Sequence, residues 1–394
     1  MSALGKRLYD GTVRTVPLGA RRYVVGEVAP FDQKNEMFRR PLWDEKLLAL
    51  GERFYRTPTP PRNRPGRSLK DQALINASWH LENTCAQGVG DGRMGLYAWQ
   101  WEEIFNYPRV PPGFRIDTRN PAAVTRDIKK AARFFGAALV GVCELDRDWL
   151  YAPVFSRATR KSVPNDVPAE YRHAVVLAVE MDYAAMCCSP EGPASAATGL
   201  GYSKMAFTAG LLAHHIRSLG FKAVACGNDT ACSIPMAVDA GLGELGRNGL
   251  LVTPQYGPRV RLAKVLTDLP LVADRPIEFG VWEFCRVCKK CARQCPSQSI
   301  SHGEPTDRPN DVSNRPGVLR WPIRAETCLA FWARRGNDCS NCIRSCPFNK
   351  PPGTLHDLVR WGISRLPRMH RLFLWGDDVF GYGSKADPAR YWSK

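Results

Sequence analysis

Apolar residues recur with regular spacing from about residue 120 onward. Asn120 is suited to cap a helix, Pro121 fits its first turn, and apolar side chains then follow at helical intervals through residues 122–135. Two apolar runs, at 138–143 and 174–179, have the composition of buried strands. This pattern predicts that regular helix and strand structure begins near residue 120.

The next hundred residues continue the alternation of helices and strands. One predicted helix ends at Gly220, and another carries Pro235 in its first turn and is closed by Gly241. Such alternation predicts an α/β (α+β) fold in which helices cover a sheet. The predicted elements are a helix at 203–219, a strand at 221–226, a helix at 233–240, and strands at 249–253 and 260–266 joined by a turn at 254–258.

The two ends of the chain lack this pattern. Residues 1–115 are predicted to be irregular because they are rich in Pro, Arg and Trp, and residues 56–67 read RTPTPPRNRPGR, which indicates an extended loop. Trp79, Trp99 and Trp101 in this part could wall an apolar pocket or form the core of a small domain. The predicted organisation is therefore an N-terminal segment at 1–115, a core at 116–275, a cysteine-rich domain at 276–350 and a tail at 351–394.

Composition places the chain among globular proteins. It has 394 residues, 44% of them hydrophobic, and a formal net charge of +17. A basic balance suits an anionic partner such as nucleic acid, but no predicted helix carries a dense stripe of Lys and Arg. No run approaches the length of a transmembrane helix, and no apolar signal region follows Met1, so a cytoplasmic location is predicted. An exported or membrane-associated mature form that has lost its signal peptide would have the same features.

Two cysteine runs give the most specific chemical signal. The first is Cys285-x2-Cys288-x2-Cys291-x3-Cys295-Pro296, and the second is Cys328-x10-Cys339-x2-Cys342-x3-Cys346-Pro347. Eight thiolates at these spacings can hold two [4Fe–4S] clusters, as in bacterial two-cluster ferredoxins. The fourth cysteine of such a run usually ligates the other cluster. One cluster is therefore assigned to Cys285, Cys288, Cys291 and Cys346, and the other to Cys295, Cys328, Cys339 and Cys342.

A structural zinc site is the alternative for these cysteines, because C-x2-C also binds zinc. Zinc sites rarely use three cysteines at this spacing followed by Cys-Pro, twice in one chain, so the motif favours iron–sulfur clusters. Such clusters are assembled on reduced thiolates, and the remaining cysteines are therefore expected to be free thiols. These are Cys85, Cys143, Cys187, Cys188, Cys226 and Cys232.

Three glycine-rich turns are predicted ahead of the cysteines, at 198–203, 226–230 and 241–249. Glycines let the backbone approach a bound group closely, and turns at strand ends form crevices. None matches a dinucleotide fingerprint, and there is no Walker A loop. A bulky cofactor held largely by backbone is therefore predicted. The candidate cofactor-binding residues are Thr198, Gly201, Gly227, Gly243, Gly246, Arg247 and Asn248.

Taken together, residues 199–271, which include GELGRNG at 243–249, and the paired cysteine runs resemble the corrinoid-dependent reductive dehalogenases. The similarity extends from about residue 116 to 350 and touches 38–43 and 377–383. A sister family, the epoxyqueuosine reductases, has the same cofactors, but GELGRNG is more similar to the dehalogenases. The resemblance implies a nitroreductase-like core that binds cobalamin with its base off, joined to a ferredoxin-like domain with two [4Fe–4S] clusters that pass electrons to cobalt.

The resemblance also implies catalytic residues. Tyr202 falls on the family's proton donor, and Arg261 matches its basic partner, with Arg259 as the alternative. A nearby guanidinium favours the phenolate and so eases proton release. Asn228 matches a polar residue of the same pocket. Candidates for the apolar pocket walls are Trp79, Trp99, Trp101 and Trp332.

The leading hypothesis is thus a reductive dehalogenase that cleaves the carbon–halogen bond of an organohalide. The expected partners are the organohalide and an external electron donor, which could be a ferredoxin, a flavodoxin or a membrane quinol system; nucleic acid is not expected, and the family suggests a homodimer. The alternatives are a tRNA-modifying epoxyqueuosine reductase, which the positive charge would suit, and a two-cluster electron-transfer protein without a corrinoid. The sequence does not name the organohalide.

Overall fold

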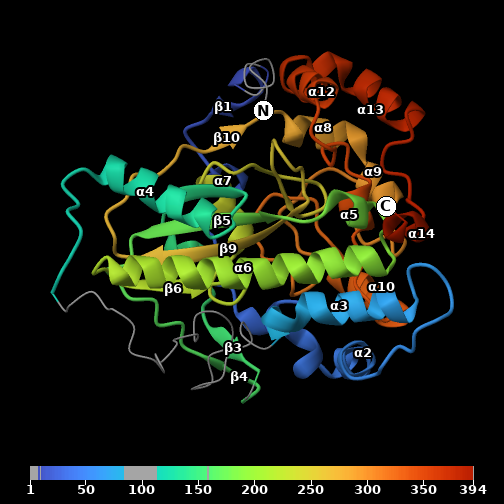
Figure 1. The fold of residues 1–394 in the computed structure, drawn as a ribbon, viewed down its shortest axis with the longest axis horizontal. Coiled ribbons are helices and arrows are strands. Elements are labelled where there is room, and N and C mark those ends of the chain that lie inside the picture. The colour runs from blue at the N-terminus through green and yellow to red at the C-terminus, as the bar shows by residue number, and fades with distance from the viewer. Residues whose placement is uncertain (1–7, 9, 84–112, 158, 394) are drawn as a thin grey trace.

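A four-stranded antiparallel sheet lies at the centre of the fold (Figure 1). The structure is a computed structural model that describes residue 8 and residues 10–83, 113–157 and 159–393. The strand order is β2-β5-β9-β6, and β5 pairs with β9 along its whole length, from His173 opposite Thr267 to Glu180 opposite Val260. The four strands are β2 (Leu139–Glu144), β5 (His173–Glu180), β9 (Val260–Thr267) and β6 (Ala223–Cys226).

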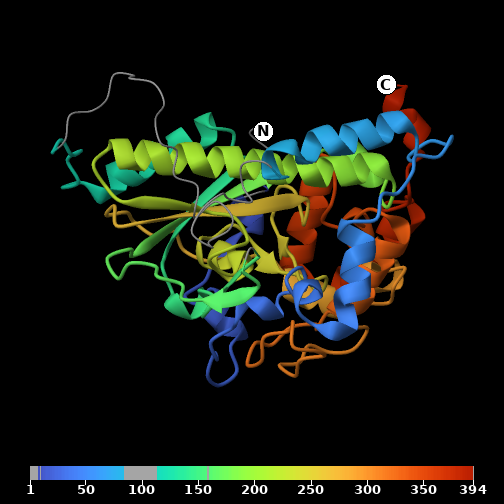
Figure 2. The ribbon, with the colours of Figure 1, turned by 90° about the horizontal axis from the view of Figure 1, so that it is seen from below.

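Both faces of this sheet are apolar, and each is covered. In β5, Val175, Leu177 and Val179 pack against α4 (Pro121–Phe134) and α6 (Gly192–Ser218), while Ala174, Val176 and Ala178 face the side of α7 (Ser233–Asp239). Successive side chains of a strand point to opposite faces, so one continuous apolar run serves two cores. Figure 2 shows α6 running along one face of the sheet.

Several predicted elements are confirmed. The Asn120 side chain caps α4 by accepting the Ala123 N–H, α7 ends before Gly241 at φ +70°, and the predicted strands correspond to β2, β5, β6, β8 and β9. The predicted turn at 254–258 is confirmed, with the backbones of Thr253 and Gly257 paired across it, but the two strands that it joins do not pair with each other. Strand β8 (Leu251–Val252) pairs with β7 (Glu244–Leu245), whereas β9 lies between β5 and β6. Residues 254–258 thus carry the chain from one sheet to another.

The start of α6 is the largest correction in the core. The predicted helix began at residue 203, after a glycine-rich turn, but α6 starts at Gly192 with Pro193 in its first turn, so residues 198–203 are helical. The glycines serve close packing instead of a turn. A Cβ on Gly199 would collide with the indole of Trp79, and a Cβ on Gly201 would lie 2.9 Å from Cγ of Arg261. Glycine costs about 1 kcal/mol in a helix, and here the close approach requires it.

The N-terminal part is less irregular than predicted. It contains α2 (Leu48–Tyr55) and α3 (Leu69–Leu81), and α3 lies alongside α6 (Figures 1 and 2). Ser68 and Asp71 form a capping box at the start of α3, a Ser-x-x-Asp signal that is visible in the sequence. Cys85, Trp99 and Trp101 lie outside the described residues.

The cysteine-rich domain follows the core directly. Strand β10 (Ile277–Glu278) pairs with β1 (Arg14–Thr15), which ties this domain to the N-terminal part. The predicted tail is largely helical over its described residues, 351–393. Its Asp377 accepts a hydrogen bond at 2.5 Å from Lys290, within the first cysteine run, and forms an ion pair at 2.6 Å with Lys350, just after the second. The helices are α8 (Val281–Cys288), α9 (Lys290–Arg293), α10 (Ala325–Arg335), α11 (Asn341–Arg344), α12 (Thr354–Arg365), α13 (His370–Val379) and α14 (Pro388–Trp392).

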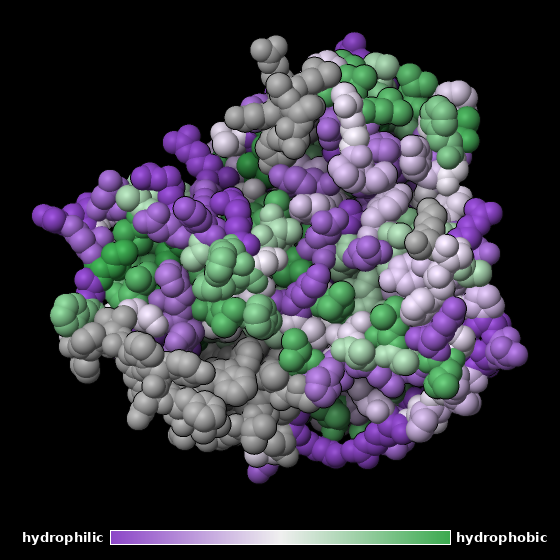
Figure 3. All heavy atoms as spheres, in the orientation of Figure 1, coloured by the Kyte–Doolittle hydropathy of each residue, from purple (hydrophilic) through white to green (hydrophobic). Residues whose placement is uncertain are grey.

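The remaining elements are short. Figure 3 shows apolar side chains gathered on the surface over α12 and α13, at the upper right. Within the described ranges, no helix has both the length and the apolar character needed to cross a bilayer. The short elements are β3 (Val154–Ser156), β4 (Lys161–Val163), α5 (Tyr183–Cys187) and 3-10 helices at Ala20–Tyr23, Gln33–Asn35, Arg40–Leu42, Glu45–Leu47, Arg147–Trp149 and Pro367–Met369.

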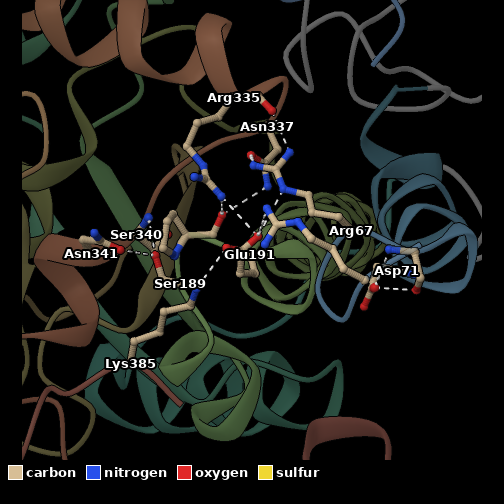
Figure 4. Close-up of polar contacts among 12 residues, drawn as sticks. Arg67, Asp71, Ser189, Glu191, Arg335, Asn337, Ser340, Asn341 and Lys385 are labelled. Atoms are coloured by element: carbon tan, nitrogen blue, oxygen red, sulfur yellow. Dashed lines mark hydrogen bonds and ion pairs between the residues drawn. The ribbon is translucent and has the colours of Figure 1, made fainter. Parts of the chain in front are cut away.

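A buried carboxylate joins four parts of the chain at the start of α6. The side chain of Glu191 is 4% exposed and receives ion pairs from Arg67 at 3.1 Å, Arg335 at 3.1 Å and Lys385 at 2.9 Å (Figure 4). Burial raises the pKa of Glu191, but the hydrogen bond from Lys385 and the charges around it outweigh burial, so its pKa is lowered. Glu191 therefore holds the loop before α3, the end of α10 and the C-terminal tail against α6.

We expect Glu191→Gln to lower the free energy of unfolding by about 3 kcal/mol, because removing one partner of a buried ion pair leaves buried cations without compensation. Urea unfolding of the cofactor-loaded protein measures this loss. Because the folded-state pKa is depressed, the stabilisation is present above the unfolded pKa of about 4.3 and is lost as the pH falls through the folded value.

Glu170→Gln is the matched control. Glu170 pairs with Lys222 at 2.7 Å, but both side chains are exposed, so its loss should leave the unfolding midpoint unchanged. Equal unfolding midpoints for Glu191→Gln and the wild type would show that the Glu191 cluster does not stabilise the fold.

Candidate functional site

A cavity of about 990 Å³ lies between α3, α6, the start of β9 and the cysteine-rich domain. Its walls combine aromatic side chains from both ends of the sequence with polar residues of the core. Nine predicted site residues line it: Thr198, Tyr202, Asn228, Asn248, Arg261, Cys295, Cys328, Cys339 and Cys342. Its aromatic lining consists of Phe38, Phe54, Tyr55, Trp79, Tyr202, Phe331 and Trp332.

Tyr202 lies in the middle of α6 and is held from three sides. The indole of Trp79 stacks on its ring with centroids 5.2 Å apart. The Arg261 guanidinium lies 4.7 Å from the centroid of the same ring. The amide Nδ2 of Asn228 donates to the phenol oxygen at 3.3 Å. The phenol is thus fixed at the cavity wall by an aromatic, a cationic and a hydrogen-bonding neighbour.

These surroundings keep the phenol protonated. Burial raises the pKa of Tyr202 above its ordinary value of 10, and the Arg261 cation opposes this effect. The carboxyl groups of Glu82, Glu36 and Asp338 raise the pKa further. A neutral phenol in the cavity can donate a proton, and the nearby cation and amide N–H would stabilise the phenolate that remains.

Arg261, and not Arg259, is the basic partner of Tyr202. Arg261 extends toward α6, where its Nη2 also donates to Oγ1 of Thr198 at 3.4 Å. Arg259 is 1% exposed and donates to Glu180 at 2.5 Å, to Asn349 at 3.0 Å and to the Met181 carbonyl. Arg259 precedes β9, which begins at Val260, so the alternation of side chains along the strand does not set its direction.

One part of the cavity wall was not predicted from the sequence. It carries the charged side chains of Glu36, Arg39, Glu82 and Arg157. Nε of Arg39 lies 3.5 Å from Oε2 of Glu36, and the backbone N–H of Glu82 donates to Oγ of Ser203 at 3.1 Å. No motif links these residues, because they come from separate segments that only the tertiary structure brings together.

Glu82 stands out electrostatically within this wall. Burial, followed by the nearby carboxyl of Asp229, raises the pKa of Glu82 to about 7, although Arg157 and Arg39 oppose the rise. Burial likewise raises the pKa of Glu36. Glu82 therefore titrates near neutral pH in the cavity that also holds the phenol of Tyr202.

The structure separates the eight cysteines into the two predicted sets. Cys295, Cys328, Cys339 and Cys342 line the large cavity, and Cys285, Cys288, Cys291 and Cys346 line a second, smaller one. The sets are neighbours, because Cys291, Cys295 and Cys342 belong to one buried cluster. The sequence did not indicate which set lies beside the cofactor cavity; in the structure it is the set that contains Cys342.

The predicted cofactor-binding residues fall in two places. Thr198 and Asn248 line the large cavity, whereas Gly246 and Arg247 border the smaller one with Asn248. Arg247 is 1% exposed and donates to the carbonyls of Cys285, Ser301 and Gly303. The remaining glycines support the wall from behind: Gly201 packs on Arg261, the Gly227 carbonyl accepts from Lys264, and Gly243 packs on Val252.

A structural zinc site is the alternative for the eight cysteines. A structural zinc ion needs four ligands at about 2.0–2.3 Å from one centre. Across the parts of the chain that the structure describes, no group of three or more His, Cys, Asp or Glu side chains converges on such a point. A [4Fe–4S] cubane instead needs four thiolates, each bound to a different iron, and each of the two sets supplies four.

The large cavity fits a bulky, polar cofactor. Its volume is at the upper end for small-molecule sites, and therefore exceeds what a small organic substrate needs. Some buried polar atoms of its lining have no hydrogen-bond partner among the described residues, namely Nε of Arg261, Oδ1 of Asp338 and Nε1 of Trp332. Buried polar atoms of this kind normally have partners, so these are available to a bound group.

Comparison with known proteins gives independent information. The family profile described as a 4Fe–4S dicluster domain matches residues 284–350. A tetrachloroethene reductive dehalogenase of Sulfurospirillum multivorans is 36% identical over 383 residues, which cover 89% of this chain and 75% of that protein. The same-named enzyme of Desulfitobacterium hafniense is 37% identical over 332 residues, which cover 75% of this chain and 60% of that protein.

A solved structure is similar as well. A catabolic reductive dehalogenase superimposes with a TM-score of 0.71 at 26% identity over 94% of this chain and 49% of its own. The chain therefore spans about half the length of that structure and 60% of the Desulfitobacterium enzyme. The predicted fold class is confirmed by this similarity.

Proposed function

Because the chain belongs to the reductive dehalogenase family, we propose that it reductively cleaves a carbon–halogen bond of an organohalide in the large cavity. One arrangement carries the proposal. The Tyr202 phenol lies in the same cavity as four cysteines of the 4Fe–4S domain, so a proton donor and an electron source meet at one cofactor-sized space.

The net reaction consumes two electrons and one proton. The carbon–halogen bond takes up both electrons, halide leaves with its bonding pair, and the carbon receives the proton. A reduced corrinoid, when bound, supplies the cobalt centre at which the carbon–halogen bond is broken. The residues that would hold the corrinoid are those of the cavity wall, including Thr198 and Asn248. The family resemblance implies that the corrinoid would be bound with its base off.

This chain's residues supply the proton and its control. Tyr202 donates its phenol proton to the carbon, and Arg261 and Asn228 stabilise the phenolate until a proton from solvent restores it. The aromatic walls, with Trp79 and Trp332, exclude water and accept an apolar substrate. Electrons enter through the set containing Cys288 and reach the cavity through the set containing Cys342. An external electron donor, a homodimer and a cytoplasmic location remain predictions.

Metal content and halide release test the proposal together. We expect anaerobically reconstituted protein to hold about eight irons and one cobalt per chain, as two cubanes and one corrinoid require. It should then release halide from members of an organohalide panel when supplied with a strong reductant.

Two results would contradict this. Eight irons without cobalt, after cobalamin was supplied, would indicate an electron-transfer protein. Cobalt with no halide release, but reduction of epoxyqueuosine in tRNA, would indicate the sister activity.

A further inference from the structure

A buried lysine lies behind the site on the opposite face of β9 from Arg261. Lys264 has no exposed surface, and its Nζ donates to the Gly227 carbonyl, to the Ala231 carbonyl at 2.7 Å and to Oγ of Ser233 at 3.0 Å. An ammonium group has three N–H donors and no acceptor. Three oxygen acceptors therefore match its charged form, and Ser233 can only accept from it.

This fixes the direction of the next hydrogen bond. The Ser233 hydroxyl has one proton, and its acceptor role toward Lys264 leaves that proton for Oδ1 of Asn228, 3.2 Å away. With Oδ1 engaged as an acceptor, the other end of the Asn228 amide is Nδ2, the donor, and it faces the phenol oxygen of Tyr202. In this series of hydrogen bonds, each donor thus determines whether the next group donates or accepts.

The direction matters most at the last step. The Tyr202 oxygen accepts from Asn228, so its own proton must point away from Asn228. Asn228 and Tyr202 both line the large cavity, which is the open side. If the Asn228 amide were turned the other way, its Oδ1 would accept the phenol proton and hold it away from the substrate.

We propose that Lys264 and Ser233 are positioning residues, which orient the Asn228 amide so that Tyr202 presents its proton to the cavity and its phenolate accepts the amide N–H. This inference rests on the proposed function, because it concerns the same proton donor. It adds two residues that act through Asn228 and that no sequence motif marks: Lys264 is fully buried, and Ser233 lies at the cavity wall.

Other charges also act on these groups. Arg261 lowers the pKa of Tyr202, while Glu82, Glu36 and Asp338 raise it. Burial lowers the pKa of Lys264, and Cys226, Asp229 and Cys232, which face it, oppose that fall. A change at Ser233 leaves all of these charged groups in place, so the comparison of two substitutions there, with and without a hydroxyl, tests the hydrogen bonds.

The test compares Ser233→Ala with Ser233→Thr. Alanine removes the link, whereas threonine keeps a hydroxyl at the same position. We expect kcat of Ser233→Ala to fall about tenfold with KM unchanged, because one hydrogen bond that stabilises the phenolate is lost. Ser233→Thr should retain activity close to the wild type. Equal loss in both variants, or a change confined to KM, would overturn the proposal.

A second readout does not depend on turnover. With a fluorinated tyrosine incorporated at position 202, ¹⁹F NMR titration of the cofactor-loaded, oxidised protein reports the ionisation of that phenol. We expect its midpoint to rise by about one pH unit in Ser233→Ala and in Lys264→Met, and not in Ser233→Thr. An unshifted midpoint in Ser233→Ala would overturn the proposal, even if Lys264→Met failed to fold. If the wild type released no halide, the proposed reaction would be wrong. The titration would still test whether Lys264 and Ser233 orient the Asn228 amide.

Discussion

Tyr202→Phe is expected to lower halide release by about a thousandfold, with iron and cobalt content unchanged. The substitution removes only the phenol oxygen, so the ring can still stack on Trp79 and lie beside Arg261. What is lost is the proton that the carbon receives. Positioned general acids typically contribute factors of 10² to 10⁴, which sets the size of the effect. Halide release under single-turnover conditions measures it.

Tyr391→Phe is a matched control, because Tyr391 packs near the start of α6 outside the cavity and should tolerate the same loss of a hydroxyl. The pH profile gives a further check. Tyr202 acts while protonated, and its pKa is raised, so its contribution is lost only as the pH rises above about 10, the ordinary value for tyrosine. Wild-type turnover in Tyr202→Phe would remove the phenol from the mechanism.

The sequence predicted those features that depend on local chemistry. Helix α4 follows from Asn120 and Pro121, and β5 from a run of apolar residues, because capping and burial on both faces leave local patterns. The division of eight cysteines into two sets also follows from spacing, since a cubane constrains thiolates that are close in the chain.

Packing between distant elements was not predictable in this way. Gly199 and Gly201 indicated a turn, yet they lie inside α6 because Trp79 and Arg261 approach the helix there. Weak helix formers thus signalled a close contact whose partners lie far away in the sequence. The capping box at Ser68 could have revealed α3, but not that α3 would pack against these glycines.

The same limit applies to the site. Tyr202, Asn228 and Arg261 were identified by resemblance, and the structure brings them together. The supporting Lys264 and the charged wall at Glu36 and Glu82 carry no motif. Their roles depend on burial and on neighbours from other strands and loops, which a single sequence does not encode locally.

Cys342→Ala is expected to abolish halide release and to lower iron from about eight to about four per chain. Cys342 lies in α11 at the wall of the large cavity, within the set that also includes Cys339. Without one of four thiolates that cluster loses a corner, and electrons no longer reach the cavity. Iron analysis and turnover with a strong reductant such as titanium(III) citrate measure the two effects.

Cys288→Ala and Cys188→Ala make this prediction specific. Cys288 belongs to the set away from the large cavity, so its loss should also remove about four irons, yet a strong small reductant can still reduce the remaining cluster beside the cavity and sustain turnover. Cys188 belongs to neither set and should keep full iron content and activity. The opposite outcome, with Cys342→Ala active and Cys288→Ala inactive under the same reductant, would reverse the order of the two clusters. Because only the cavity-side set can pass an electron directly to a group beside Tyr202, the contrast between the two substitutions tests the electron path independently of the proton donor.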